Sequence, residues 1–239
     1  MTTDHDHIVT KFDEDLRQLD NYIAEMGGLA EHQFADSIKA LVRRDSELAE
    51  QVIAGDKRID DIEHEVDMHT ISMLALRQPM ADDLRVVITA LRIASVIERI
   101  GDYAKNISKR TVAITQTPPV GPSRTIARMG NVVQEMIKTV LDSYLQRDAD
   151  LAQDVRLRDE EVDALHTSLF RELLTYMMED PRSISACTHL LFVAKNIERI
   201  GDHATNIAEN VHFLVHGVMP DDNRPKGDQS SYTVIGGED

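Results

Sequence analysis

ERIGDYAKNI, at Glu98–Ile107, returns 100 residues later as ERIGDHATNI at Glu198–Ile207. Both copies lie in long segments without proline, in which apolar residues recur at helical spacing. Each copy has Glu, Asp and Asn at positions i, i+4 and i+8, and on a helix these three side chains share one face. The stretch therefore predicts two equivalent helices, each with an apolar stripe that becomes acidic along its length.

We call the two ten-residue stretches, Glu98–Ile107 and Glu198–Ile207, the ERIGD boxes. The repeat extends into the segments that precede them. Asp45 and Asp56 recur as Asp148 and Asp159 at an offset of 103, whereas the boxes recur at an offset of 100, so three residues are lost at the intervening proline-containing turn. The connections between the helices are short enough for up-down packing. The sequence therefore predicts an all-α fold of two tandem, similar three-helix bundles with six long helices.

Proline and glycine place the boundaries of these elements. Gly27-Gly28 predicts a bend in the first helix rather than a break. The helices are expected at about residues 8–47, 49–76, 82–114, 125–147, 148–178 and 182–216.

The same signals divide the chain into two repeats, a linker and a tail. The tail is polar and rich in Asp, Gly, Pro and Ser, and we expect it to be disordered. The predicted divisions are residues 1–116 for the first repeat, 117–123 for the Pro-rich linker, 124–217 for the second repeat and 218–239 for the tail.

Composition limits the classes of partner and compartment. The formal net charge of −16 argues against nucleic acid as a partner, because phosphates would be repelled, and it suits cations or basic protein surfaces. The single cysteine, Cys187, corresponds to Val87 in the first repeat, so we expect it to pack in the core of a protein from a reducing compartment. Neither a secretory signal nor a membrane-spanning run is present, which predicts a cytoplasmic protein that meets membranes only through partners.

Four acidic pairs could converge into two equivalent sites. Each unit has a DxxxD pair on its second helix and an ExxxD pair on its third, and antiparallel packing would bring the pairs together. Four converging carboxylates repel one another unless protons or cations balance them. Such clusters bind Mg²⁺ or Mn²⁺, or Fe or Zn where an imidazole is near, and bridging carboxylates could hold more than one metal. The candidate carboxylates are Asp56, Asp60, Glu98, Asp102, Asp159, Asp163, Glu198 and Asp202, with His64 and His166 as outer ligands.

A plainer interpretation is available for any one pair, because most DxxxD pairs on helices lie on a solvated face. Four pairs in two equivalent sets favour a site. Gly101 and Gly201 add to this, since a glycine inside a helix costs about 1 kcal/mol relative to alanine. Their natural use is the close approach of a neighbouring helix beside the carboxylates.

The sequence resembles the PhoU family of phosphate-transport regulatory proteins over nearly the whole chain. The resemblance is carried by RQPMADDLR at Arg77–Arg85, the two ERIGD boxes, LTYMMEDP at Leu174–Pro181 and RPKGD in the tail. It implies two three-helix bundles, a homodimer, and divalent or trivalent metal ions in multinuclear clusters held by E(D)xxxD motifs. By position the implied ligands are the eight carboxylates named above, with Asn106 and Asn206 as further candidates. His166 replaces Glu63 of the first half, so the two sites are expected to be unequal.

The resemblance also implies a function without catalysis. Members of the family are negative regulators of the phosphate-starvation response that connect a phosphate-specific ABC transporter, through its PstB-type ATPase, with a PhoR-type sensor histidine kinase. The alternative is a carboxylate-bridged metal enzyme of the ferroxidase or phosphatase type, which needs an open coordination position and a substrate pocket. The sequence shows no nucleophile arrangement and only one Glu-x-x-His pair, Glu209 and His212, so the adaptor is favoured.

Overall fold

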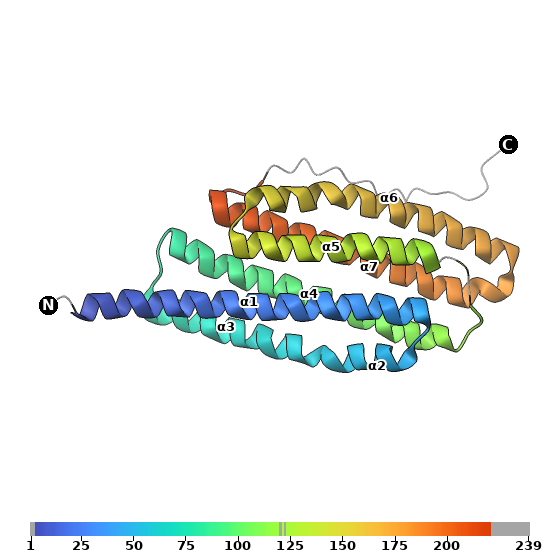
Figure 1. Ribbon diagram of the computed structural model, residues 1–239, viewed down its shortest axis with the longest axis horizontal. Coiled ribbons are helices and arrows are strands. Elements are labelled where there is room, and N and C mark those ends of the chain that lie inside the picture. The colour runs from blue at the N-terminus through green and yellow to red at the C-terminus, as the bar shows by residue number, and fades with distance from the viewer. Residues whose placement is uncertain (1–2, 120, 122, 221–239) are drawn as a thin grey trace.

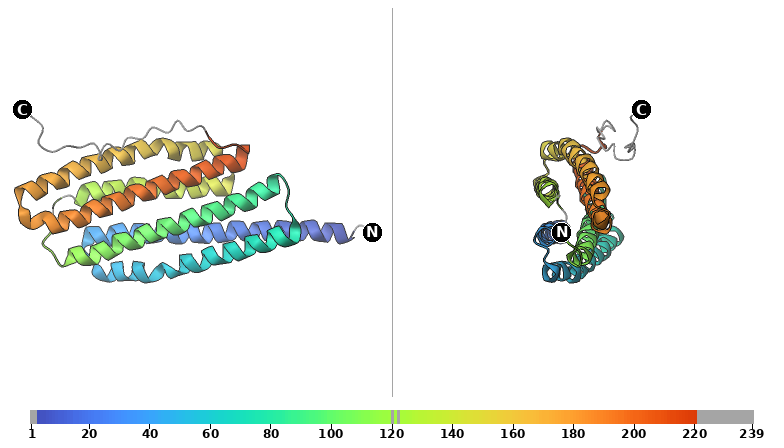
Figure 2. Two further views of the ribbon diagram at one scale, coloured as in Figure 1. Left: turned by 180° about the vertical axis from the view of Figure 1, so that it is seen from behind. Right: turned by 90° about the vertical axis from the view of Figure 1, so that its right-hand side faces the viewer.

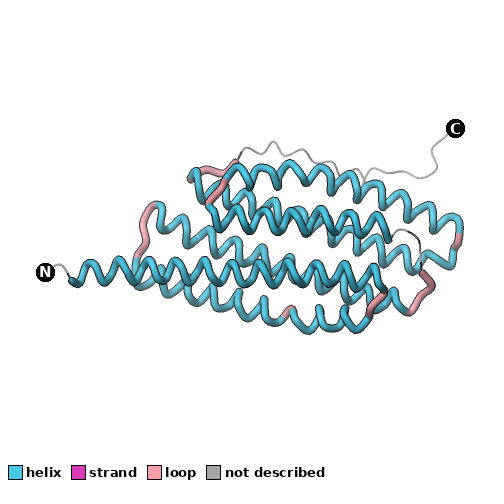
Figure 3. Tube along the Cα trace, in the orientation of Figure 1, coloured by secondary structure: helices cyan, strands magenta, loops and turns pink. Residues whose placement is uncertain are grey.

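The computed structural model describes residues 3–119, 121 and 123–220, and all regular secondary structure among them is helical (Figures 1 and 3). The expected all-α fold with six long helices is confirmed, whereas nearly all of the predicted tail lies outside the described residues. The elements are α1 (Thr3–Arg43), α2 (Ser46–Gly55), α3 (Lys57–Arg77), α4 (Asp82–Thr115), α5 (Ser123–Gln146), α6 (Ala149–Glu179), the 3₁₀ turn η1 (Pro181–Ser183) and α7 (Ile184–His216).

The predicted second helix of the first half is wrong in one respect, because it is divided into α2 and α3 at Asp56. Gly55 precedes the division, and Arg158 stands at the equivalent position of α6, which is continuous. Glycine is a much weaker helix former than arginine, which accounts for the difference between the halves. The first predicted helix also ends earlier than expected, at Arg43, and it runs through Gly27-Gly28 without a break.

The turn that joins the first two helices is repeated in the second half. Arg44 and Arg147 both adopt the left-handed conformation, with φ of 56° and 55°. The carboxylates of Asp45 and Asp148 each accept a hydrogen bond of 3.0 Å from the backbone amide three residues later, and so cap α2 and α6. The duplication read from the sequence is therefore present in the backbone as well.

The two halves lie side by side, with α4 against α7 and α1 against α5 (Figure 2). The guanidinium of Arg92 lies 5.7 Å from the ring centre of Phe213, and that of Arg110 lies 4.1 Å from the ring centre of Phe192. Residue numbers rise along α4 as they fall along α7, so these two helices are antiparallel. The seam between them brings the two ERIGD boxes together at the middle of the molecule.

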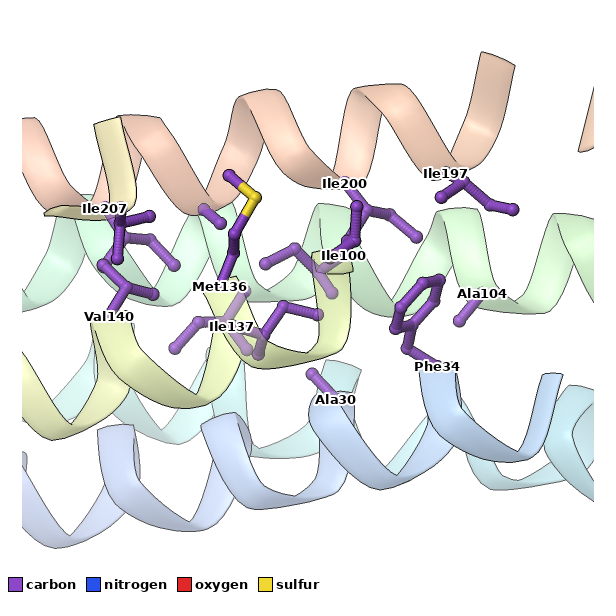
Figure 4. Packing of buried hydrophobic residues seen from close by; sticks show 14 of the residues in the cluster. Ala30, Phe34, Ile100, Ala104, Met136, Ile137, Val140, Ile197, Ile200 and Ile207 are labelled. Carbon is purple, nitrogen blue, oxygen red and sulfur yellow. The ribbon is translucent and has the colours of Figure 1, made fainter. Parts of the chain in front are cut away.

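One hydrophobic core runs through both halves. Ile100 and Ile200, which are equivalent in the repeat, are buried together with Phe34 of α1 and Ile137 of α5 (Figure 4). Cys187 is fully buried in this core, as its apolar counterpart predicts. Among the described residues, every helix is too short or too polar to span a bilayer.

Candidate functional site

The innermost carboxylate of the first half belongs to Asp56, at the junction of α2 and α3. The residue is 2% exposed, and its Oδ1 accepts a hydrogen bond of 3.0 Å from Nε2 of Gln33. Its Oδ2 accepts a charged hydrogen bond from the ammonium group of Lys105 on α4. A Cβ on Gly101 would lie 3.3 Å from Oδ1 and 3.0 Å from Ile59. The close approach expected beside Gly101 is therefore present.

The carboxylates of α3 and α4 meet in the first half, as the sequence predicts. Burial raises the pKa of Glu98 to about 7, with further contributions from the charges of Asp102, Glu63 and Asp60. Burial also raises the pKa of Asp60, and the charge of Asp56 adds to that increase. We call Asp56, Asp60, Glu63, Glu98 and Asp102 the first acidic cluster. Neighbouring carboxylates that raise one another's pKa favour any state in which a proton or a cation neutralises their negative charge.

The equivalent carboxylates of the second half lie deeper in the protein. Asp159, Asp163 and Glu198 are all buried, whereas Asp202 is half-buried. We call these four residues the second acidic cluster. The hydroxyl of Thr205 lies 3.5 Å from Oδ1 of Asp159, as donor to acceptor. Within the same helix, the ammonium group of Lys195 donates a hydrogen bond of 2.8 Å to Oε1 of Glu198. This cluster thus also has a basic partner.

The four residues expected as outer ligands divide between the interior and the surface. His166 is buried on α6, one turn after Asp163, whereas His64 is exposed on α3. Asn106 and Asn206 are half-buried. Each lies on the same helix face as the carboxylates of its cluster, but among the described contacts their side chains make none with those carboxylates. Only His166 is therefore both buried and close along the helix to a cluster.

The side chains suit a metal ion in kind but not in present arrangement. Carboxylate oxygens are the ligands that hard cations prefer. Across the ranges that the structure describes, however, no three His, Cys, Asp or Glu side chains are placed so that they could hold one ion. Both oxygens of Asp56 are already engaged, by Gln33 and by Lys105. Metal binding in the first half would therefore require these contacts to rearrange.

Sequence reasoning missed the basic and amide partners of the clusters. Lys105 follows Asp102 by three residues and Glu98 by seven, which places it on the acidic face of α4. It is also one of the two positions at which the ten-residue boxes Glu98–Ile107 and Glu198–Ile207 differ. That signal was available, whereas the contact of Gln33 with Asp56 depends on how α1 packs and leaves no sequence pattern.

Comparison with known proteins supports the resemblance drawn from these motifs. A sequence model of the PhoU domain matches residues 23–111 and 126–211, one match for each half. The chain is 50% identical to the phosphate-specific transport system accessory protein PhoU homolog of Rhizobium meliloti (strain 1021), covering 95% of this chain and 96% of that one. It is 52% identical to the protein of the same description from Caulobacter vibrioides (strain NA1000 / CB15N), covering 93% and 97%.

Solved structures give the same result in three dimensions. The crystal structure of PhoU from Pseudomonas aeruginosa matches with a TM-score of 0.83 and 40% identity, over 87% of this chain and all of that one. The phosphate transport system regulatory protein PhoU from Streptococcus pneumoniae matches with a TM-score of 0.82 at 27% identity, over 88% and 99%. The repeated domain, the relatives and the solved structures agree, and the chain belongs to the PhoU family.

Proposed function

We propose that this chain is a regulatory accessory protein of a phosphate-specific transport system. The observation that carries the proposal is the extent of the similarity. Relatives described as accessory proteins of that system align at 50% and 52% identity over more than nine-tenths of both chains. Both halves match the PhoU domain, and identity at this level over most of both chains means that the likeness extends beyond the fold.

The finer proposal is a negative regulator of the phosphate-starvation response that works through protein contacts. Its partners would be the PstB-type ATPase of the transporter and a PhoR-type histidine kinase, with a homodimer as the active form. The net charge of −16 favours partners with basic contact surfaces, since complementary potentials speed and orient association. No group-transfer chemistry is needed for this role.

Metal binding by the two acidic clusters is the second component of the proposal. Asp60, Glu98 and Asp102 would hold a cation in the first half together with Asp56, and the four carboxylates of the second acidic cluster would hold one in the second. The metal would supply positive charge between the second and third helices of each half. Its effect would be to oppose the repulsion from Asp102 that adds to burial in raising the pKa of Glu98.

Deletion of the gene tests the regulatory role directly. Phosphate-starvation genes should then stay switched on in phosphate-rich medium. Purified protein should bind the ATPase and the cytoplasmic region of the kinase, and the double variant Asp102→Ala, Asp202→Ala should bind them more weakly if the metals order the surface. Normal repression after deletion, together with no binding to either partner, would overturn the proposal. Oxygen consumption or phosphate release by metal-loaded protein would instead favour the enzyme.

A further inference from the structure

Arginine side chains line the seam between α4 and α7, on the side that faces away from α1 and α5 (Figure 2). At 100° per residue, Arg92, Arg99 and Arg110 of α4 lie within about 20° of one another around the helix. Arg199 of α7 is the repeat equivalent of Arg99. Three of the four are exposed, and Arg110 is half-buried. We call these four residues the arginine seam.

Aromatic rings of the opposite helix restrain three of the guanidinium groups. The rings of Phe213 and Phe192 lie under the two arginines at the ends of the seam. At its centre, the guanidinium of Arg199 lies 5.7 Å from the ring centre of Tyr103, which itself stacks on His203. A guanidinium over a ring is restrained in orientation but keeps its N–H edges for hydrogen bonds. The seam therefore presents charged donors that are already partly ordered.

The guanidinium groups of the arginine seam have no carboxylate partner in the described part of the chain. Within residues 3–119, 121 and 123–220 they form no ion pair and donate no hydrogen bond. The charge of Arg99 does reach Glu63 of α3, where it opposes the rise in pKa that burial chiefly causes. The chain has 42 acidic and 26 basic residues, so carboxylates are in excess. Arginines that still lack one are available to carboxylates from outside the chain.

The shape of the seam favours a narrow partner. It extends for about 27 Å from Arg92 to Arg110, at about 1.5 Å per residue of α4. The acidic pairs of α4 and α7 lie on the helix faces beside it. A wide polyanion, such as a nucleic acid or an anionic membrane, would also meet these carboxylates and be repelled. A single acidic segment of polypeptide is narrow enough to lie along the arginines alone.

We propose that the arginine seam is a docking surface for an acidic segment of a partner protein, with apolar side chains between its carboxylates. The guanidinium groups pair with the carboxylates through parallel hydrogen bonds. The apolar side chains pack on the rings, of which Phe192 is 51% exposed. The inference goes beyond the proposed function, which names partners but no contact surface, and it does not depend on metal binding.

The test titrates the full chain into a fluorescein-labelled helical peptide of about eighteen residues, with Glu and Leu at helical spacing. Fluorescence anisotropy of the peptide reports binding. The net charge of −16 repels this peptide, so binding requires a local positive surface. The double variant Arg99→Gln, Arg199→Gln should bind at least about tenfold more weakly than the wild type, because charge-assisted pairs are lost.

The matched control is Arg17→Gln with Arg43→Gln, which removes two exposed arginines of α1. Its affinity should stay within about twofold of the wild type, since distant exposed charges are screened. Arg92→Gln with Arg110→Gln changes the ends of the seam, farther from the acidic pair of α4, and should weaken binding as the central variant does. A wild type that does not bind the peptide, or seam variants that bind it as the control does, would refute the docking surface.

Two further measurements distinguish other occupants of the seam. If sedimentation shows a lower mass for the central variant but not for the control, a second copy of the chain covers the seam and the assignment to a partner is wrong. The assignment is equally wrong if amide substitutions in the tail tighten peptide binding at least about fivefold, because a tethered competitor has then been removed. The tail substitutions are made at Asp221, Asp222, Asp228, Glu238 and Asp239.

The expected results are an unchanged mass and an unchanged peptide affinity. Neither measurement bears on whether the chain regulates phosphate transport, which deletion of the gene decides. The docking surface and the proposed function can therefore fail separately.

Discussion

The hydroxyl group of Tyr144 donates a hydrogen bond of 2.7 Å to Oδ1 of Asp20, and so joins α5 of the second half to α1 of the first. Arg147 donates to the same carboxylate at 2.8 and 2.9 Å, and its guanidinium lies 4.4 Å from the Tyr144 ring centre. Tyr144 is fully buried, and burial raises the pKa of its hydroxyl, followed in size by the charge of Asp20. The hydroxyl therefore stays protonated and serves as a permanent donor between the halves.

Removing Asp20 should destabilise the contact between the halves more than removing the tyrosine hydroxyl. Asp20→Ala leaves a buried hydroxyl and a guanidinium without their acceptor, which should lower the free energy of unfolding by about 2–3 kcal/mol. Tyr144→Phe keeps the ion pair of Asp20 with Arg147 and should cost only about 1 kcal/mol. Denaturant unfolding measures both values.

Asp13→Ala supplies the control, because Asp13 is an exposed carboxylate on the same helix. It should change the free energy of unfolding by less than about 0.5 kcal/mol. If Asp20→Ala were as mild as this control, the Tyr144 contact would contribute nothing measurable to the association of the halves.

The duplication and the acidic face could be predicted because both follow from residue spacing. Offsets of 103 before the proline-containing turn and 100 after it predicted equivalent helices, and the i, i+4 spacing of Glu98 and Asp102 predicted a shared face. The division of α2 from α3 could have been suspected from Gly55, but a single glycine within a helical pattern is usually tolerated. The division is not needed to bury the carboxylate, since Asp56 at the junction and Asp159 within continuous α6 are both 2% exposed.

Contacts between distant segments could not be predicted from spacing. Asp20 and Tyr144 are far apart in the sequence, and neither belongs to a repeated motif, so only the packing of α1 against α5 brings them together. The same holds for Gln33 and Asp56. Lys105 is an intermediate case, because its face was predictable whereas its choice of Asp56 as partner depends on how α4 packs against α2 and α3.

The two helix-interior glycines should respond differently to alanine. A Cβ at Gly201 would meet Val162 at 3.4 Å, an ordinary contact, whereas one at Gly101 would meet Ile59 at 3.0 Å and Asp56 at 3.3 Å. Gly201→Ala should therefore raise the free energy of unfolding by up to about 1 kcal/mol, the gain in helix propensity. Gly101→Ala should gain less or lose stability, since Asp56 is held in place by Gln33 and Lys105.

Thermal melts of both variants, run beside the wild type, provide the measurement. The informative quantity is the order of the two melting temperatures, with Gly201→Ala above Gly101→Ala. The reverse order would show that the first half yields to a methyl group more readily than the second, contrary to the distances around the two glycines.

Metal content should follow the duplication. Asp102→Ala should remove about half of the metal bound by the saturated protein, and the double variant with Asp202→Ala should remove nearly all of it, since by the proposal each cluster would supply its own ligands. Elemental analysis after dialysis against Mn²⁺ measures the content. Asp67→Ala, which alters an exposed acid of α3 outside the predicted ligands, is the control. Unchanged content in the double variant would place the metal elsewhere.

The metal-free protein should lose stability as the pH rises from about 4.5 to about 7. The pKa of Glu98 is raised from 4.5 to about 7, chiefly by burial and next by the charge of Asp102. Between these values the folded protein retains a proton that the unfolded chain has released. The unfolded state then binds fewer protons, so the free energy of unfolding falls with rising pH, and this loss is complete above the folded pKa.

Glu98→Gln should flatten that dependence, because the amide stays neutral in both states. With a chelator present, the variant should be more stable than the wild type at pH 8 and closer to it at pH 5. Some slope should persist, since burial also raises the pKa of Asp60 and of Glu63. Glu50→Gln, at an exposed glutamate of α2, controls for loss of charge. A Glu98→Gln profile parallel to that of the control across this range would mean that Glu98 is not held among like charges in the folded protein.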